Sequence, residues 1–251
     1  MGDYLSQLKD FYATHKRVAL LFSGGKDSVA MMHMTKPWWD KTVFVWVNTG
    51  ASCKEITAYM AEVRKKVPHF VEIVSNQPKF IATHGFPSDV VPLRQTTEGF
   101  YYDSTPRSVN TLVCSKYDCC KANIWTPIWE FMQTGDFDGM LKGQKLADHE
   151  QASWDDHCVV NGRRIDIAYP LKGWSDDGVR SYIKDCGELM YERYKLKHSS
   201  LDCWSCTAYW EQLDDRAQYM RTRHPDQWAM VESVVKDIRV AIKDQTKHLG
   251  D

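Results

Sequence analysis

Apolar runs and amphipathic segments alternate along the first third of the chain. Short apolar runs predict β-strands at residues 17–22, 42–47 and 70–74. The second run is unbroken, which is typical of a parallel strand buried on both faces. The segments between the runs repeat apolar residues at three- and four-residue steps, and they predict helices at 3–15, between Ser28 and Pro37, and at 53–67. This alternation predicts right-handed crossovers and a doubly wound, mostly parallel α/β sheet.

The rest of the chain adds a strand, a hairpin and a helical tail. Phe137 to Gly143 is predicted as a fourth strand. Segments 158–160 and 164–168 flank Asn161-Gly162, which favours a hairpin with a two-residue turn. Helices are predicted at 116–133 with a break near Pro127, at 147–153, from the Ser175 cap through Cys186, and at 207–247 with an interruption near Pro225. Glycines and prolines punctuate 75–113, which predicts a long, partly helical excursion.

Composition bounds the domain organisation and the class of protein. The chain has 251 residues, 43% of them hydrophobic, which allows either one large domain or one domain with an appendage. We expect a nucleotide-binding domain over residues 1–206 and a helical C-terminal extension, 207–251, packed on it. The net charge of −1 argues against a global basic field for nucleic acid or anionic membranes. Because no stretch approaches 18 apolar residues and the first residues lack the form of a signal peptide, we expect a cytoplasmic protein.

The stretch Ser23-Gly24-Gly25-Lys26-Asp27-Ser28 lies between the first predicted strand and the helix after it. Glycines at such a turn let backbone N–H groups approach an anion, and the helix N-terminus adds about +0.5 of an elementary charge. The spacing is not that of a Walker A loop. Asn48-Thr49-Gly50 follows the second strand, so both stretches are expected at the carboxyl edge of the sheet, where α/β proteins bind ligands. A glycine turn that merely starts a helix is the alternative.

The sequence SGGKDS after an apolar strand resembles the PP-loop of the adenine-nucleotide alpha-hydrolase superfamily, which contains the N-type ATP pyrophosphatases. The resemblance implies a Rossmann-like fold and adenine-nucleotide binding. It implies a phosphate site shaped by Ser23, Gly24, Gly25, Asp27 and Ser28 with Lys26 as the charge clamp, and a nucleotide pocket lined by Asn48, Thr49 and Gly50.

Later segments resemble the phosphoadenosine phosphosulfate (PAPS) reductase branch of this superfamily. Gly143 to Asp148 is similar to its Gly-x-Arg phosphate-contact segment, with Lys145 in place of arginine. Lysine keeps the charge but loses the bidentate fork. Tyr169 to Ser175 is similar to its Pro-Leu-x-x-Trp-Ser/Thr helix start, and Tyr191 to Tyr194 and Leu201 to Thr207 resemble its tyrosine and cysteine segments. Gly143 and Lys145 are therefore expected at the nucleotide.

Cysteines supply the second chemical signal. In a cytosolic chain, clustered cysteines indicate metal or redox chemistry more than disulfides. The pair Cys119-Cys120 and the pair Cys203 and Cys206 resemble the cluster-binding pattern of adenylyl sulfate (APS) reductases, which implies a 4Fe–4S cluster on these four residues. Zinc and free thiols remain alternatives, although adjacent cysteines suit one tetrahedral ion poorly. The other cysteines, Cys53, Cys114, Cys158 and Cys186, are expected to be small buried hydrophobic residues.

Two reactions compete. The resemblance to reductases implies attack by a thiol on APS or PAPS and release of sulfite, but their tail cysteine has no counterpart after Cys206 in this sequence. The complete SGGKDS favours Mg²⁺-dependent cleavage of ATP between its α- and β-phosphates, followed by cluster-assisted sulfur transfer, with Lys26, Asp27 and Ser28 as the catalytic residues. We favour the second reaction. A non-catalytic nucleotide-binding regulator is a third possibility.

The candidate reactions imply which partners to expect. They are an adenine nucleotide, a sulfur donor protein or thiol reductant, and a sulfur acceptor that the sequence does not name. A nucleic-acid acceptor is compatible with a local patch of lysines and arginines, and the family's frequent dimers make a homodimer possible. The acidic pairs Asp155-Asp156, Asp176-Asp177 and Asp214-Asp215 lie near turns or helix starts, and we expect them to be solvated or to cap helices.

Overall fold

The computed structural model describes residues 4–90, 112–146, 148, 154–187, 203–208 and 213–247. The chain divides into two compact units. The first contains Met1–Val47, Lys54–Ile73 and Ile128–Lys197, and the second contains Asn48–Cys53, Val74–Pro127 and His198–Asp251. Each unit is described by itself. The predicted boundary between residues 206 and 207 stays a prediction.

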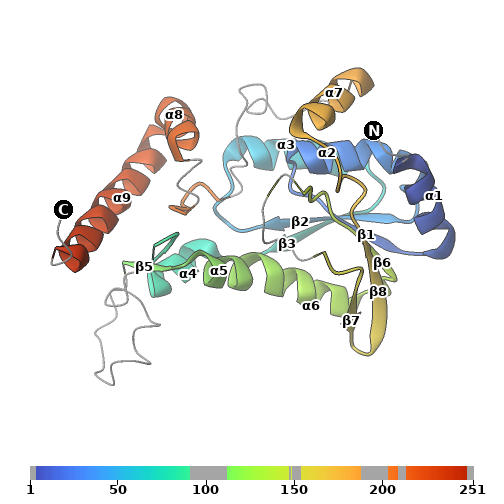
Figure 1. Ribbon diagram of the computed structural model, residues 1–251, viewed down its shortest axis with the longest axis horizontal. Helices are drawn as coiled ribbons and strands as arrows, with labels where there is room; N and C mark the ends of the chain where they lie inside the picture. The colour runs from blue at the N-terminus through green and yellow to red at the C-terminus, as the bar shows by residue number, and fades with distance from the viewer. Residues whose placement is uncertain are drawn as a thin grey trace. The chain divides into compact units, whose positions relative to one another are not determined.

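A six-stranded sheet forms the first unit (Figure 1), in the order β3-β2-β1-β6-β8-β7. Its strands are β1 (Val18–Leu21), β2 (Thr42–Asn48), β3 (Phe70–Val74), β6 (Gly139–Leu141), β7 (His157–Val160) and β8 (Arg163–Ala168). Strand β1 runs parallel to β2 and β6, and β6 runs parallel to β8. Only the β7–β8 pairing among these is antiparallel. The predicted mostly parallel α/β sheet is confirmed, although β6 is shorter than the predicted strand at 137–143.

The β7–β8 hairpin turns at Asn161-Gly162 as the sequence predicts. Both residues have positive φ, 50° at Asn161 and 75° at Gly162. Positive φ at both central positions is what a type I′ turn requires, and asparagine and glycine tolerate it best. The local sequence therefore determines this antiparallel edge of the sheet.

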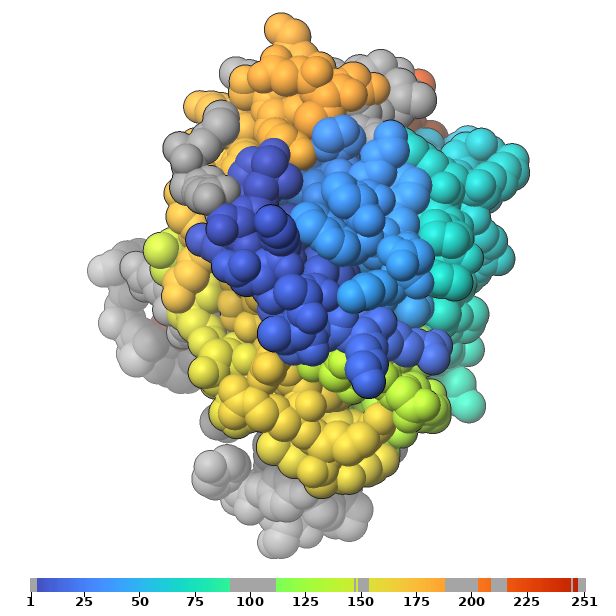
Figure 2. Space-filling model, turned by 90° about the vertical axis from the view of Figure 1, so that its right-hand side faces the viewer, coloured from blue at the N-terminus to red at the C-terminus, as the bar shows by residue number. Residues whose placement is uncertain are grey.

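Helices cover both faces of the sheet. Figure 1 shows α2 (Lys26–Met34) and α3 (Lys54–Lys66) on one face and α6 (Thr126–Thr134) on the other. The remaining helices of this unit are α1 (Tyr4–Thr14), the short η1 (Lys36–Trp38) and α7 (Asp176–Cys186). Helix α7 packs on α2, and Figure 2 shows its orange surface directly against the blue of α2.

One hydrophobic core cluster lies between the sheet and α6. Val43 and Val45 of β2, Met140 of β6 and Ile165 of β8 are buried there together with Met132 of α6. The unbroken apolar run of β2 is buried over its first five positions. Burial on both faces explains why this strand lacks the alternation of a half-exposed strand.

The described residues of the second unit form a small sheet and five helical segments. Strands β4 (Phe86–Ser88) and β5 (Val113–Ser115) pair in parallel, a pairing that the sequence pattern did not predict. The helices are α4 (Gln77–His84), α5 (Lys116–Cys120), the π-helical η4 (Lys121–Trp125), α8 (Leu213–Arg223) and α9 (Pro225–Thr246). The break predicted near Pro127 takes the form of η4, and the interruption near Pro225 is the His224 junction between α8 and α9.

Some predicted features lie outside the described residues. These are most of the helix at 147–153, the middle of the excursion at 91–111, and the segment Tyr191 to Tyr194. Among the helices that the structure describes, none combines the length and apolar character needed to cross a membrane.

Candidate functional site

The loop Ser23–Gly25 joins β1 to α2 through a backbone that only glycine suits. Gly24 has φ of 75°, and a Cβ there would lie 2.8 Å from Cε of Met60. Gly25 is the extended N-cap of α2, and its N–H donates to Oγ of Ser23 at 3.3 Å. The positive φ disfavours a side chain at Gly24, and a Cβ there would also require the terminal methyl group of Met60 to move. The predicted glycine turn before a helix is present.

Helix α2 begins at Lys26 with its N-terminal N–H groups near this loop. Ser28 is buried and its hydroxyl donates to the carbonyl of Gly25 at 2.9 Å, which fixes the first turn. The first N–H groups of a helix lack partners within the helix and attract anions. The local geometry is therefore that of an anion site, with Ser28 supporting its shape.

Lys145 is the centre of a charge network at the start of α2. Its side chain is fully buried, and its Nζ lies 2.7 Å from Oδ1 of Asp27, 2.6 Å from Oδ1 of Asp148 and 3.3 Å from Oδ1 of Asp176. Burial alone would lower the pKa of Lys145, but the hydrogen bonds to Asp148 and Asp27 outweigh it and raise that pKa. Lys145 is therefore a charged group held by carboxylates.

Lys26 belongs to the same network. Its Nζ lies 2.9 Å from Oδ2 of Asp27 and 3.1 Å from Oδ1 of Asp176, so these two carboxylates each contact both lysines. Asp176 begins α7, and Ser175 before it caps that helix by accepting from the N–H of Gly178 at 3.1 Å. Asp176 is 55% exposed and lies in the first turn of α7, as expected of a solvated residue at a helix start, and the packing of α7 on α2 also brings it to the lysines.

Gly143 lies against the first turn of α2. A Cβ at Gly143 would lie 3.3 Å from Cβ of Asp27 and 3.4 Å from its carbonyl carbon. The absence of a side chain lets the segment after β6 approach α2 closely enough for Lys145 to reach Asp27. The structure thus brings Gly143 and Lys145 to Asp27, which lies between Lys26 and Ser28 in the first turn of α2, while their role at a nucleotide stays a prediction.

Asn48, Thr49 and Gly50 follow β2 and belong to the second unit. Gly50 has φ of 75°, and its N–H donates to Oδ1 of Asn48 at 3.1 Å. The hydroxyl of Thr49, a residue that is 1% exposed, shares a hydrogen bond of 3.3 Å with Sγ of Cys203. Thr49 is thus connected to the cysteine segment, a contact that the sequence reasoning missed.

The four predicted ligand cysteines all lie in the second unit. Cys119 and Cys120 end α5, while Cys203 and Cys206 close a turn in which the N–H of Cys206 donates to the carbonyl of Cys203 at 3.1 Å. Cys119 is buried and the other three are partly buried. Burial raises the pKa of the Cys119 thiol to about 11, and the nearby Cys206 contributes to that rise. The structure therefore brings both cysteine pairs into one region.

Polar side chains surround Cys119. Nε2 of Gln77 donates to its Sγ at 3.6 Å, and Nδ2 of Asn123 donates to the same sulfur at 3.8 Å. Oε1 of Gln77 accepts from Oγ of Ser205 at 2.8 Å. Gln77, Asn123 and Ser205 are each at most 5% exposed. Nothing in their sequence spacing pointed to this cluster.

Comparison with known proteins decides the family. The phosphoadenosine phosphosulfate reductase domain matches residues 17–209, which is more than half of the chain. The chain belongs to the PAPS reductase domain family. The phosphoadenylyl-sulfate (PAPS) reductase from Candida auris, solved as a phosphate complex, shares the fold with a TM-score of 0.51 at 12% identity. The similarity covers 78% of this chain and 86% of that chain. No curated protein sequence matches.

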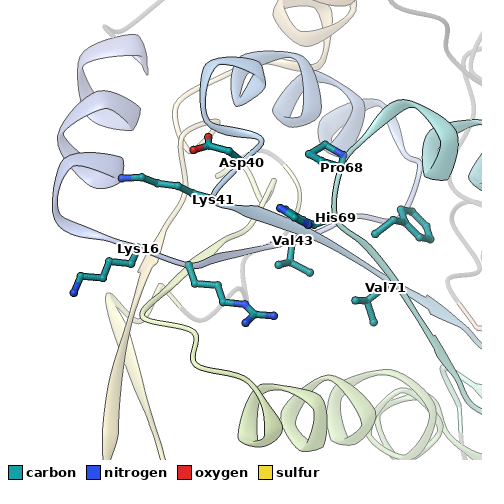
Figure 3. A pocket seen from close by; sticks show the side chains of 9 residues that line it. Lys16, Asp40, Lys41, Val43, Pro68, His69 and Val71 are labelled. Atoms are coloured by element: carbon teal, nitrogen blue, oxygen red, sulfur yellow. The ribbon is translucent and has the colours of Figure 1, made fainter.

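Within this PAPS reductase family member, a pocket of about 500 Å³ lies at the opposite, amino-terminal edge of the sheet (Figure 3). Lys16, Asp40, Lys41 and His69 contribute to its lining. Nζ of Lys41 donates to the carbonyl of Tyr12 at 2.9 Å, so this ammonium group is already engaged. The carboxyl edge, where β1 leads into the Ser23–Gly25 loop, remains the candidate nucleotide site.

The remaining cysteines match the prediction in part. Cys53 and Cys114 are buried, as expected of small hydrophobic residues, whereas Cys158 and Cys186 are partly buried. Asp148 belongs to the charge network but was not predicted as a site residue from the sequence. The segment similar to the family's phosphate contact does include it, and its spacing of three residues from Lys145 could have indicated the pairing.

Proposed function

We propose that this PAPS reductase family member binds ATP with Mg²⁺ at the Ser23–Ser28 loop, cleaves it between the α- and β-phosphates, and transfers sulfur with the help of an iron–sulfur cluster. The observation that carries the ATP reading is the charge network. Lys26 and Lys145 contribute +2, and Asp27, Asp148 and Asp176 contribute −3, so the five groups carry −1.

A net negative network would repel phosphates that arrive without a cation. Mg²⁺ is commonly held by one or two carboxylates together with substrate phosphates, so it could neutralise the negative charge of the network and of the phosphates together. Asp27, in the first turn of α2, would be the ligand. Its two carboxylate oxygens contact Lys26 and Lys145, so it would exchange one of these lysines for the cation. A cation at this position favours ATP over APS or PAPS, because a sulfonucleotide offers no β,γ-pyrophosphate for the metal to chelate.

In this reaction the residues of the chain act by position and charge. The N–H groups at Gly24, Gly25 and the start of α2 would bind the pyrophosphate. Lys26 would exchange its carboxylate partners for phosphate oxygens and neutralise the charge that develops on the leaving group. An acceptor oxygen forms a bond to the α-phosphorus while the bond from that phosphorus to the bridging oxygen breaks, so pyrophosphate leaves and the acceptor becomes adenylated. Sulfur then displaces AMP from the acceptor.

The cysteines suit a polynuclear cluster better than a single ion. Around zinc, a Zn–S distance of about 2.3 Å in a tetrahedron sets sulfur atoms about 3.8 Å apart. The adjacent residues Cys119 and Cys120 fit one such tetrahedron poorly, whereas the separate iron atoms of a cluster relax this constraint. Cys119, Cys120, Cys203 and Cys206 would be the ligands, and a bound cluster would supply an iron site able to carry sulfur.

The reductase reaction is the second candidate, and the match to the PAPS reductase domain favours it. In that case an external thiol would attack the sulfate sulfur of APS or PAPS, and the same loop and Lys145 would bind the nucleotide phosphate. The nucleotide phosphate would then have to bind beside the negatively charged network without Mg²⁺. This requirement separates the two candidates.

One experiment distinguishes these functions. Anaerobically purified protein is incubated with Mg²⁺ and labelled ATP, APS or PAPS, with and without a thiol. Pyrophosphate from ATP supports the first function, and sulfite from APS or PAPS with no pyrophosphate from ATP supports the second. Tight ATP binding without either product would indicate a non-catalytic regulator.

The cluster has its own test. Cys203→Ala should lower the iron and sulfide content of anaerobic protein, whereas Cys158→Ala, which changes a cysteine on β7 in the first unit, should not. Unchanged iron in Cys203→Ala would contradict the ligand assignment.

A further inference from the structure

Gln77 joins the two cysteine segments of the second unit through one side chain. Its amide nitrogen donates to Sγ of Cys119 on α5, and its amide oxygen accepts from Oγ of Ser205. Ser205 lies between Cys203 and Cys206 in the sequence. One buried amide, 1% exposed, therefore connects segments that are far apart along the chain.

The start of α4 positions the backbone of Gln77. Gln77 is the first residue of α4, and its N–H donates to the carbonyl of Thr49 at 2.8 Å. The helix start is held by Asn76, whose side chain accepts from the N–H of Lys79 at 3.0 Å, and by Pro78 in the first turn. An N-cap and a proline at this position define the helix start. Burial and the hydrogen bonds to Cys119 and Ser205 then hold the side chain itself.

A second amide points to the same sulfur. Asn123 on η4 donates from Nδ2 to the carbonyl of Cys119 at 3.0 Å and to its Sγ at 3.8 Å. A neutral thiol is a weak acceptor, whereas hydrogen bonds to charged acceptors are about twice as strong. Two buried amide donors directed at one sulfur suit a thiolate that is bound to metal better than a free thiol.

We propose that Gln77 is a positioning residue that holds the Cys119 and Cys203–Cys206 segments as one ligand set for a metal centre and donates a hydrogen bond to the metal-bound Cys119 sulfur. This inference rests on the iron–sulfur centre of the proposed function. Residues around metal ligands commonly contribute 10–100-fold to metal affinity by orienting those ligands.

The test compares Gln77→Leu and Gln77→Glu with the exposed Gln7→Leu of α1 as a matched control. Gln77→Glu keeps the size and the acceptor for Ser205 but removes the N–H donor. Each protein is reconstituted anaerobically with iron and sulfide, and its folding is checked by circular dichroism. The transfer of iron to a chelator and the sulfur-to-iron absorption band are then measured.

We expect both Gln77 variants to bind iron about 10–100-fold more weakly than wild type. Their absorption band should shift to longer wavelength, because loss of the donor raises the energy of the sulfur lone pair. Iron retention and a spectrum equal to wild type in the folded Gln77→Glu variant would overturn the inference. Wild-type protein that takes up no iron would instead refute the cluster of the proposed function, so the two failures are distinguishable.

Discussion

Nζ of Lys145 lies 2.7 Å from Oδ1 of Asp27, although 118 positions separate the two residues in the chain. The contact links the segment after β6 to the first turn of α2, the helix that follows β1. Strands β1 and β6 are neighbours in the sheet. Lys145 is expected to contact phosphate, and through this contact it also holds the segment after β6 against the start of α2. Changes at Lys145 should therefore affect both stability and nucleotide binding.

Lys145→Met tests this double role. Removing Lys145 leaves three partly exposed carboxylates without one of their cations and costs about 1.5–3 kcal/mol. We expect the free energy of unfolding in urea to fall by that amount and ATP binding to weaken. Lys9→Met, at an exposed position of α1, is the matched control and should change neither quantity appreciably. Equal stability of both variants would show that the network contributes nothing.

Gly24→Ala tests the loop. The left-handed backbone costs a residue with a side chain about 1–2 kcal/mol, and the new Cβ would lie 2.8 Å from Cε of Met60. We expect a lower melting temperature and weaker binding of ATP. A Cβ at Gly173 would meet no described atom within 4 Å, so Gly173→Ala should be nearly silent in both measurements. A silent Gly24→Ala would mean that the loop conformation is not required.

Asp176 should make stability depend on acid pH. Burial raises its pKa, but the hydrogen bond and charge of Lys26 and the charge of Lys145 outweigh this and lower the pKa. Its stabilising contribution is therefore fully present above the ordinary Asp pKa of about 3.9 and is lost as the pH falls through the lower folded-state pKa.

The corresponding measurement is the free energy of unfolding of wild type and Asp176→Asn from neutral to acid pH. The difference between them should shrink as the pH falls. Asp177→Asn changes an exposed carboxylate in the same helical turn and controls for the helix dipole. A difference that is independent of pH would contradict the pairing of Asp176 with the lysines.

Removal of Mg²⁺ tests the charge argument for ATP. Because the network carries −1, chelation with EDTA should weaken ATP binding at least about tenfold, equal to 1.4 kcal/mol, in isothermal titration. AMP, which lacks the pyrophosphate, should be affected much less. ATP binding that is indifferent to EDTA would remove the main support for the ATP reading and favour the reductase.

Local patterns predicted most of the fold because their causes are local. The unbroken run of β2 is buried as parallel strands are, Asn161-Gly162 makes the hairpin, and Ser175 caps α7. The parallel pairing of β4 with β5 was missed, because two three-residue strands separated by a long excursion carry too little periodicity.

By itself, the sequence determined the order of the elements, the glycine turn at Gly24 and the candidate chemistry of Lys26, Lys145 and the cysteines. Only the tertiary structure decided which groups meet. Asp176 reaches the lysines because α7 packs on α2, and Gln77 reaches Cys119 because α4 begins beside α5. Backbone preference acts over a few residues, whereas these contacts depend on how buried faces pack together.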